Sequence, residues 1–382
     1  MSDLGFLEKL LAGAEVEWMP LGTVTAYEQP TKYLVQSKNY DDRFRTPVLT
    51  AGKTFVLGYT DETSGIYEAS KSPTIIFDDF TTANKWVDFD FKAKSSAMKM
   101  ITSIDNKKFH IKYIYHWLNT MPSGLVEGDH KRQWISNYTS KTIPIPCPEE
   151  PEKSLAIQGE IVRILDSFTE LTAELTAELE LRKEQYNHYR DQLLTFEDED
   201  VRWAKFVDVA EFRRGTAITK NEATDGDVPV VANGPVPSYS HAEHNRKGET
   251  VVVARSGAYA GYVSYWNQPI FLTDAFSVHP HPEAMTPRFV YHVLQNKQAQ
   301  LHAMKKGAGV PHVRVKEMEQ YDVPVPSLET QRRTVAILDK FDKLTTSLSE
   351  GLPREIELRQ KQYEYYRDLL LSFPKPAEGG EV

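Results

Sequence analysis

The sequence has little cysteine and no long hydrophobic run. A single cysteine, Cys147, among 382 residues excludes an internal disulfide framework and cysteine-based zinc fingers. No stretch approaches the ~18–20 uncharged apolar residues that cross a bilayer, so no membrane partner is expected. The N-terminus has no basic region followed by an apolar run, which argues against secretion and makes the cytoplasm the expected location.

The chain also lacks a net positive charge. Its 45 Lys and Arg stand against 54 Asp and Glu, a formal charge of −9, which alone argues against a nucleic-acid partner. The acid is unevenly distributed, because residues 147–200 hold 5 basic and 15 acidic side chains. Residues 30–145 hold 16 basic and 12 acidic side chains, and residues 201–326 hold 14 and 12. Both of these regions are therefore weakly basic.

What the sequence does contain is an internal repeat. The segments Glu180–Phe196 and Glu357–Phe373 share 11 of 17 residues at an offset of 177. Three further pairs of segments match: Ile143–Pro146 with Val323–Pro326, Ile164–Phe168 with Ile337–Phe341, and Val16–Trp18 with Val201–Trp203. The last pair indicates that the N-terminal piece completes a repeat whose body lies at the C-terminus, so the repeat is circularly permuted.

Both repeated flanks predict long helices. Apolar or aromatic residues follow one another at steps of three and four along 157–196 and again along 337–373, the spacing of a coiled-coil seam. The first seam has one extra four-residue step within Thr172–Leu179, a tandem Thr-Ala-Glu-Leu duplication, which is a coiled-coil stutter. We predict that the two seams pair as an antiparallel coiled coil; an ordinary bundle core is the alternative.

The ends of these helices carry their own signals. Ser154 and Ser327 are the expected N-caps. Pro353 should kink the second helix or divide it in two, because proline cannot donate the helical hydrogen bond. At ~1.5 Å per residue, each Thr-Ala-Glu-Leu unit adds about 6 Å of helix. The helices are therefore predicted to be a spacer of adjustable length.

Between the flanks lie two inserts that read as mixed α and β and align only in fragments, such as Tyr115-His116 with Tyr291-His292. Strands are expected at 73–77, 86–91, 250–254 and 262–265, and helices at 109–118 and 287–301. The expected fold class is α+β, with two mixed α/β domains separated by two long helices in a pseudo-twofold, circularly permuted repeat. The expected segments are 1–18 completing the C-terminal repeat, 19–146 as the first domain, 147–200 as the central spacer, 201–326 as the second domain, 327–373 as the C-terminal spacer, and 374–382 as a tail.

Catalytic patterns are sparse. Asp79, Asp90 and Lys92 fit a loose metal-dependent nuclease pattern, but a strand of alternating charge explains them more simply. His241 and His244 could share a helical face around a metal, yet no third ligand stands nearby in sequence. No catalytic residue, metal ligand or cofactor is therefore predicted in this chain.

The inserts do contain side chains suited to reading DNA. Arg, Lys, Asn, Gln, Ser and Thr bind base edges and phosphates. Such residues cluster on predicted loops at 78–85 and 128–134 of the first insert, and at 255–259 and 305–314 of the second. The predicted DNA contacts are Lys53, Thr81, Thr82, Asn84, Lys85, Lys131, Arg132, Gln133, Arg255, Ser256, Tyr259, Lys305, Lys306, His312 and Arg314.

Two unlike inserts between two like helical flanks resemble the specificity subunit of a type I restriction-modification enzyme. The resemblance runs from about Leu7 to Phe373 and is most specific in Gln158–Phe168, Gln331–Phe341 and the Thr-Ala-Glu-Leu units. Those units, with Glu357–Asp368, resemble the type IC branch. The resemblance implies that each insert is a target recognition domain reading one half of an asymmetric, bipartite site in double-stranded DNA, while the helices set the gap.

The resemblance also implies partners. Two modification subunits would bring S-adenosylmethionine and methylate adenine, and two ATP-dependent, Mg²⁺-dependent restriction subunits would complete the complex in a bacterial or archaeal cytoplasm. The chain itself would carry no cofactor and no activity. The segment Gly307–Arg314 corresponds to a Gly-rich loop of the family, whereas Gly128–Trp134 lacks that pattern. A self-contained metal-dependent nuclease and a coiled-coil scaffold remain the alternatives.

Overall fold

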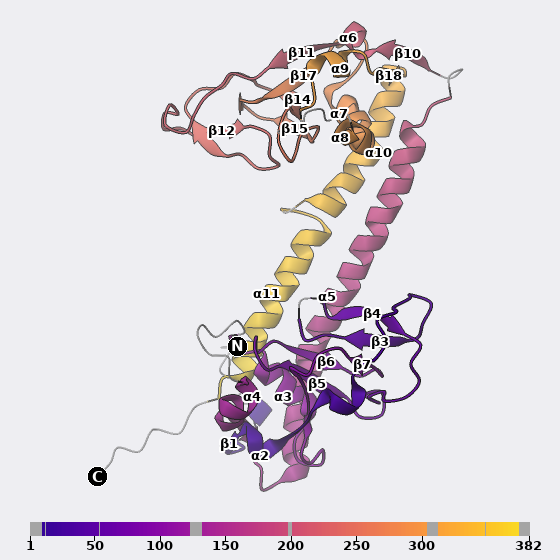
Figure 1. The fold of residues 1–382 in the computed structure, drawn as a ribbon. Helices are drawn as coiled ribbons and strands as arrows, with labels where there is room; N and C mark the ends of the chain where they lie inside the picture. Colours follow the sequence, from indigo (N-terminus) through magenta and orange to yellow (C-terminus); the bar gives the residue numbers. More distant parts are fainter. Residues whose placement is uncertain are drawn as a thin grey trace. The chain divides into compact units, whose positions relative to one another are not determined.

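The chain forms two compact units (Figure 1). The computed structural model describes residues 10–11, 13–52, 54–122, 132–197, 201–303, 312–347 and 349–373. The first unit comprises Met1–Glu174 together with Ile356–Val382, and the second comprises Leu175–Glu355. Both ends of the chain thus belong to one unit, in agreement with a circularly permuted repeat.

Each unit holds one mixed α/β domain. The first domain contains β1 (Val16–Pro20), α2 (Leu21–Val24), β2 (Thr25–Glu28), η1 (Pro30–Tyr33), β3 (Thr46–Leu49), β4 (Val56–Thr60), β5 (Thr74–Asp78), β6 (Asn84–Val87), β7 (Lys92–Ala93), β8 (Met98–Ser103), α3 (Ile111–Leu118), α4 (Gln133–Ser136), η2 (Tyr138–Ser140) and β9 (Thr142–Pro146). The second contains β10 (Arg202–Lys205), α6 (Phe206–Val209), β11 (Ala210–Arg214), β12 (Val228–Val231), β13 (Tyr239–His241), β14 (Glu249–Ala254), β15 (Val263–Asn267), β16 (Phe271–Leu272), β17 (Ala275–Pro280), α7 (Pro287–Asn296), α8 (Gln298–Ala303), α9 (Val315–Glu319) and β18 (Asp322–Val325). The long helices are α5 (Pro151–Leu194), α10 (Leu328–Thr346) and α11 (Leu352–Leu371).

The two domains share one topology. A four-stranded sheet has the order β2-β8-β5-β6 in the first domain and β11-β17-β14-β15 in the second. A three-stranded sheet has the order β4-β3-β7 in the first and β13-β12-β16 in the second, with one parallel pair in each. The inserts are therefore two versions of one fold, although their sequences align only in fragments.

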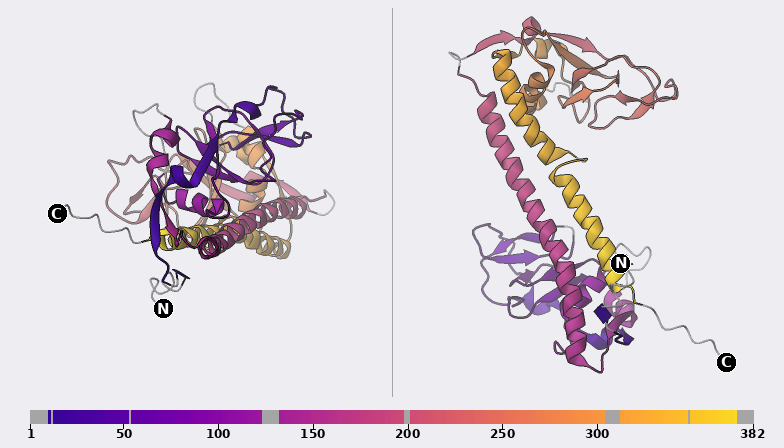
Figure 2. Two further views of the ribbon diagram at one scale, coloured as in Figure 1. Left: turned by 90° about the horizontal axis from the view of Figure 1, so that it is seen from below. Right: turned by 180° about the vertical axis from the view of Figure 1, so that it is seen from behind.

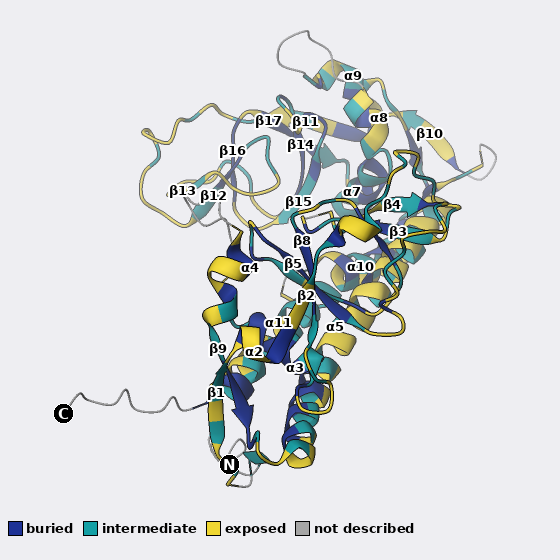
Figure 3. Ribbon diagram, turned by 60° about the horizontal axis from the view of Figure 1, so that its bottom comes forward, coloured by how far each residue is buried: buried dark blue, intermediate teal, exposed yellow. Residues whose placement is uncertain are grey.

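The central strands account for the core of each domain. All five residues of β5 are buried, and β14 is buried from Thr250 to Ala254, because both strands are covered on both faces (Figure 3). Helices α3 and α7 pack their apolar faces on these sheets, with Tyr113 and Phe289 fully buried.

A two-stranded ribbon leads into each long helix. In the first unit β1 pairs with β9, which places Trp18 opposite Pro144; in the second β10 pairs with β18, which places Trp203 opposite Pro324. Proline is tolerated because each strand has a free edge. The N-terminal segment therefore occupies in the first unit the place that the segment after α5 occupies in the second.

The helical seams pair within each unit. In the first, α5 packs against α11, where Phe168 stacks on Tyr366 with ring centroids 5.2 Å apart. In the second, α5 packs against α10, where Tyr189 stacks on Phe341 at 5.6 Å. The paired helices run antiparallel (Figures 1 and 2). The predicted antiparallel coiled coil is therefore confirmed.

The second flank is divided into α10 and α11. Pro353 lies in the first turn of α11, where a missing N–H is harmless. Gly351, just before it, has a φ of +84°, and a Cβ there would lie 2.6 Å from the carbonyl oxygen of Lys343 and 2.7 Å from that of Leu344. This junction therefore requires glycine.

We expect Gly351→Ala to destabilise the protein by about 2–4 kcal/mol, because it adds a backbone clash to the strain of a left-handed alanine. Gly248 is the matched control, because its φ is +70° and no atom lies within 4 Å of its Cβ position. Gly248→Ala should cost only ~1 kcal/mol. Urea unfolding compares the two variants, and equal costs would contradict the clash.

Several predicted boundaries were wrong. The helix expected at 287–301 is two helices, because the chain turns at Lys297, whose N–H bonds to Val293 and Leu294 carbonyls. The strand expected at 86–91 ends at Val87. The first spacer helix begins at Pro151, so Ser154 is buried inside its first turns, whereas Ser327 caps α10 as predicted. No helix in the described parts of the chain is long and apolar enough to span a membrane.

Candidate nucleic-acid interface

In both domains a predicted polar cluster lies on the loop that follows the buried strand, β5 in the first domain and β14 in the second. We call residues 79–83, between β5 and β6, the first central loop, and residues 255–262, between β14 and β15, the second central loop. The carbonyl of Asp79 accepts the N–H of Gln133 at 2.9 Å, and that of Arg255 accepts the N–H of Val313 at 2.9 Å. The first loop is thus joined to the start of α4, and the second to the segment that precedes α9. Within the described residues, the two polar clusters predicted in each insert therefore meet at these bonds.

The second central loop borders a basic pocket of about 400 Å³. The residues that line it are Arg214, Arg255, His312, Val313, Arg314, Val315 and Lys316. Four of these carry a positive charge, and none of the described lining residues is acidic. Such a concentration of cations suits a phosphate group or the acceptor edge of a guanine.

A hydrogen-bond network fixes the base of this pocket. Asp274 accepts hydrogen bonds from the Arg255 guanidinium at 2.6 Å and from the Ser256 hydroxyl at 2.9 Å. The Asn233 side-chain oxygen accepts the backbone N–H groups of Arg255 at 2.8 Å and Ser256 at 3.1 Å, while its amide donates to Asp274 at 2.6 Å. The loop and its arginine are therefore held in place before any ligand binds.

The first central loop is braced by different chemistry. Asp78 accepts the backbone N–H groups of Phe80 at 2.8 Å and Thr81 at 3.1 Å, and Thr82 adopts a φ of +59°, which is rare for a β-branched residue. Asp79 is fully buried, pairs with the fully buried Lys99 at 3.2 Å and accepts the N–H of Trp134 at 3.0 Å. This loop is braced as well, but its ion pair is fully buried, whereas Arg255 and Asp274 are each about 40% exposed or more.

The predicted contacts fall into four groups. Lys85, Arg132, Tyr259 and Arg314 are exposed, and Thr81, Asn84, Arg255 and His312 are half-buried. The residues that are buried, and so support the loops instead of facing a ligand, are Thr82, Gln133 and Ser256. The positions that lie outside the described residues are Lys53, Lys131, Lys305 and Lys306.

Gln133 and its neighbours were wrongly predicted as part of a loop. Residues 133–136 form α4, the N–H of Gln133 binds the carbonyl of Asp79, and Gln133 is 3% exposed. Sequence reasoning also missed Arg214, Lys316 and the bracing pair Asn233 and Asp274. The Arg-Arg-Gly run at 213–215 was a usable signal for Arg214, whereas nothing local marks Asn233.

The two domains are attached to the long helices by matching contacts. In the first unit, Asp166 of α5 accepts His116 Nε2 at 2.9 Å and pairs with Lys112 at 2.8 Å. Lys112 also lies over the ring of Trp86, 5.2 Å from its centroid. Burial raises the pKa of Asp166, but the hydrogen bonds from His116 and Lys112 outweigh it and hold that pKa below its usual value.

The second unit repeats this attachment. Asp339 of α10 binds His292 Nε2 at 2.7 Å and Arg288 Nε at 2.7 Å, and Arg288 lies 4.6 Å from the ring centroid of Tyr265. The alignment of Tyr115-His116 with Tyr291-His292 is thereby confirmed in three dimensions.

A buried glutamine completes each attachment. The Gln158 side chain accepts the N–H of His110 at 2.8 Å and donates to the carbonyl of Lys108 at 3.0 Å. Gln331 does the same with Thr286 at 2.9 Å and Ala284 at 2.7 Å. The motifs that repeat in the sequence are thus the residues that hold the domains.

Asp166→Asn should lower the free energy of unfolding by about 1–3 kcal/mol at pH 7, because His116 and Lys112 lose their charged partner. Since the folded-state pKa of Asp166 is lowered, its contribution is present above the unfolded pKa near ~4 and disappears as the pH falls through the folded value. Denaturant unfolding at pH 7 and under acid conditions measures this. Glu170→Gln, at an exposed site on α5, should have little effect at either pH.

The nuclease alternative fails on geometry. Asp79 is buried against Lys99, Asp90 accepts the hydroxyl of Ser70 at 2.6 Å, and Lys92 pairs with Glu62, so the three do not form one site. Within the described residues no cluster of three or more His, Cys, Asp or Glu could hold a metal ion.

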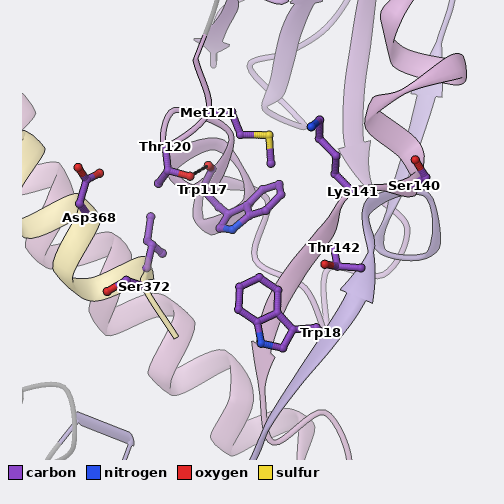
Figure 4. Close-up of a pocket in the computed structure, with 10 residues that line it drawn as sticks. Trp18, Trp117, Thr120, Met121, Ser140, Lys141, Thr142, Asp368 and Ser372 are labelled. Carbon is purple, nitrogen blue, oxygen red and sulfur yellow. Dashed lines mark hydrogen bonds between the residues drawn. The ribbon is translucent and has the colours of Figure 1, made fainter. Parts of the chain in front are cut away.

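A second, open pocket of about 590 Å³ lies in the first unit between β1, β9, α3 and α11 (Figure 4). Trp18 and Trp117 form one wall, with Asp368 of α11 and Ser372, just after α11, opposite and Lys141 at the side. One cation facing one carboxylate and two indoles does not suit a polyanion. The basic pocket of the second domain is therefore the better candidate for nucleic acid.

Comparison with known proteins agrees with this arrangement. The family model "Type I restriction modification DNA specificity domain" matches residues 16–181 and 199–358. The chain is 53% identical to the EcoR124I/EcoR124II type I restriction enzyme specificity subunit of Escherichia coli, covering 98% of this chain and 99% of that one. It is 30% identical to a putative specificity subunit of Haemophilus influenzae, covering 96% and 98%.

The fold is similar to that of a solved relative. The crystal structure of a type I S subunit from M. genitalium superposes with a TM-score of 0.67 at 16% identity, covering 95% of this chain and 98% of that one. The family model and the two curated relatives, together with the matching domains and their duplicated attachments, identify the family. The chain belongs to the DNA specificity subunits of type I restriction-modification systems.

Proposed function

We propose that each domain of this non-catalytic subunit reads one half of an asymmetric, bipartite site in double-stranded DNA through its central loop. The observation that carries the proposal is the basic pocket beside the second central loop, with Arg214, Arg255, Arg314 and Lys316 around a braced base. Cations on a pre-ordered loop lose less conformational entropy when they bind phosphates and guanine edges.

The asymmetry of the site follows from the difference between the loops. At equivalent places in one fold, the first loop presents Phe80 and Thr81 to solvent, and the second presents Arg255 and Tyr259. Side chains of different charge and shape select different bases. The two half-sites should therefore differ in sequence.

Partners belong to the same proposal. The repeated flanks offer similar surfaces twice, which fits two copies of a modification subunit that carries S-adenosylmethionine and methylates adenine. Two ATP-dependent, Mg²⁺-dependent restriction subunits would complete the nuclease. The continuous helix α5 would set the gap between the half-sites.

A map of methylated adenines tests the proposal. The chain is expressed with the modification subunit of its own system in a host free of adenine methylation, and modified bases are read across the host genome. One asymmetric, bipartite motif with a fixed gap is expected. No new modification from a soluble, associated complex would overturn the proposal and favour a scaffold.

A further inference from the structure

Each central loop carries one large aromatic side chain that the protein leaves in solvent. Phe80 in the first central loop is 42% exposed, and Tyr259 in the second is 51% exposed. Isolated exposed apolar residues are common on proteins. Here, however, the same connection presents an aromatic ring in two domains whose sequences align only in fragments, and it does so in the loops proposed to contact DNA.

The backbone around Phe80 is fixed. Its N–H is held by Asp78 at 2.8 Å, and the turn closes through the N–H of Thr82 on the carbonyl of Asp78 at 2.9 Å. Thr82 adopts its strained, left-handed conformation within this turn. Strain of this kind collects at ligand-binding segments, where the surrounding structure over-determines it.

The turn around Tyr259 is also fixed. Its carbonyl accepts the N–H of Tyr262 at 2.8 Å, and Gly257 and Gly261 adopt φ values of +78° and +85°. A Cβ on Gly261 would lie 3.0 Å from the backbone of Leu301, so the loop is packed closely against α8. A rigid loop that displays a ring loses little conformational entropy when the ring binds.

The neighbouring positive charges indicate which part of DNA these rings can contact. Arg255 belongs to the same loop as Tyr259 and lines the basic pocket together with Arg314. In the first domain, Arg132 directly precedes Gln133, whose N–H binds the carbonyl of Asp79 next to Phe80. Cations hold the phosphates, while a phenyl ring without a polar atom gains only from apolar surface. On DNA that surface is the thymine methyl group, the deoxyribose or the face of an unstacked base.

We propose that Phe80 and Tyr259 are matched aromatic base contacts, one for each half-site, which pack against the apolar surface of the bases while the neighbouring cations bind phosphates. This inference rests on the proposed function, because it assumes that the central loops face DNA. The sequence had already predicted Tyr259 as a DNA contact; the structure adds Phe80 and assigns both contacts to the aromatic ring.

Equilibrium binding by the complex with its modification subunit tests the proposal. The duplexes are the cognate site and two versions in which one half-site is scrambled. Phe80→Ala should weaken discrimination at the first half-site by roughly tenfold to a hundredfold and leave the second unchanged; Tyr259→Ala should do the reverse. Tyr259→Phe should retain most of the discrimination, because it keeps the ring.

The salt dependence of binding separates a base contact from a phosphate contact. Loss of a phosphate contact reduces the slope of log K against log salt by about 0.9, whereas loss of a ring leaves the slope unchanged. Ile104→Ala, at a residue 58% exposed and outside the loops, and Val236→Ala, at one 70% exposed, are the controls and should have no effect.

The outcomes are distinguishable. If the unaltered complex recognises a bipartite site but both ring variants bind all duplexes as it does, the aromatic inference is overturned and the proposed function stands. If the unaltered complex does not distinguish the duplexes, the proposed function itself fails. A ring variant that no longer binds the modification subunit would assign that ring to a protein interface and also overturn the inference.

Discussion

Deletion of Thr172–Leu175 should redirect the assembled complex to a DNA motif with the same two half-sites and a shorter gap. Helix α5 runs without interruption through this segment, so the deletion removes one Thr-Ala-Glu-Leu unit and about 6 Å of helix. That length is roughly one or two base-pair steps of DNA. The remaining Thr-Ala-Glu-Leu repeat has the same sequence as the deleted one. A leucine therefore returns to the same place in the seam, and the helix should still pair.

Adenine methylation mapping measures this change. Methylation of the original motif should fall by more than about a hundredfold, since a gap wrong by even one step costs at least as much as a mismatched pair or two. The double variant Thr172→Ala, Thr176→Ala preserves the length of α5 and serves as the control; its motif should be unchanged. An unchanged gap in the deletion variant would refute the role of α5 as a spacer.

The double variant Arg214→Ala, Arg314→Ala should lose recognition of the half-site read by the second domain. Both residues line the basic pocket, and each contact to a phosphate or guanine is worth about 1–3 kcal/mol, so their combined loss amounts to roughly a thousandfold in affinity. Discrimination at the other half-site should survive, because the first domain is untouched.

Arg213→Ala is the matched control for this prediction. Arg213 precedes Arg214 on β11, but it pairs with Glu211 at 2.6 Å and does not line the pocket. Adjacent residues on a strand point to opposite faces. Binding titrations with each half-site scrambled in turn provide the measurement. An equal loss at both half-sites would contradict the assignment of the pocket to the half-site of the second domain.

The sequence predicted those parts of the fold that repeat or that follow a short period. Each of the predicted patterns lies within a short segment. They are the two helical seams, the Ile-Leu-Asp segments that begin at Ile164 and Ile337, and the proline-containing strands Ile143–Pro146 and Val323–Pro326. Pro353 indicated the division between α10 and α11, and Tyr115-His116 anticipated one attachment. The prediction of Ser154 as an N-cap was wrong because the helix begins at Pro151, about one turn earlier.

Non-local contacts lay beyond prediction. The pocket network joins Asn233 to Asp274, 41 residues away, and the parallel pair of β3 with β7 joins Val48 to Lys92. Gln133 was misjudged because its backbone bond to Asp79, 54 positions earlier in the chain, has no signal in the local sequence. Residue type marks a group as able to read DNA, but burial decides which of these groups are free to do so.

The paired attachments bear on how such a protein changes over generations. In both units the helix supplies the carboxylate and glutamine, while the domain supplies the histidine, the cation and the aromatic ring beneath it. Recombination between the repeated segments would thus transplant a whole domain, and each charge would meet a partner of opposite charge at the new position. A bacterial population could acquire a new protected sequence in a single genetic exchange, with no unstable ancestor in between.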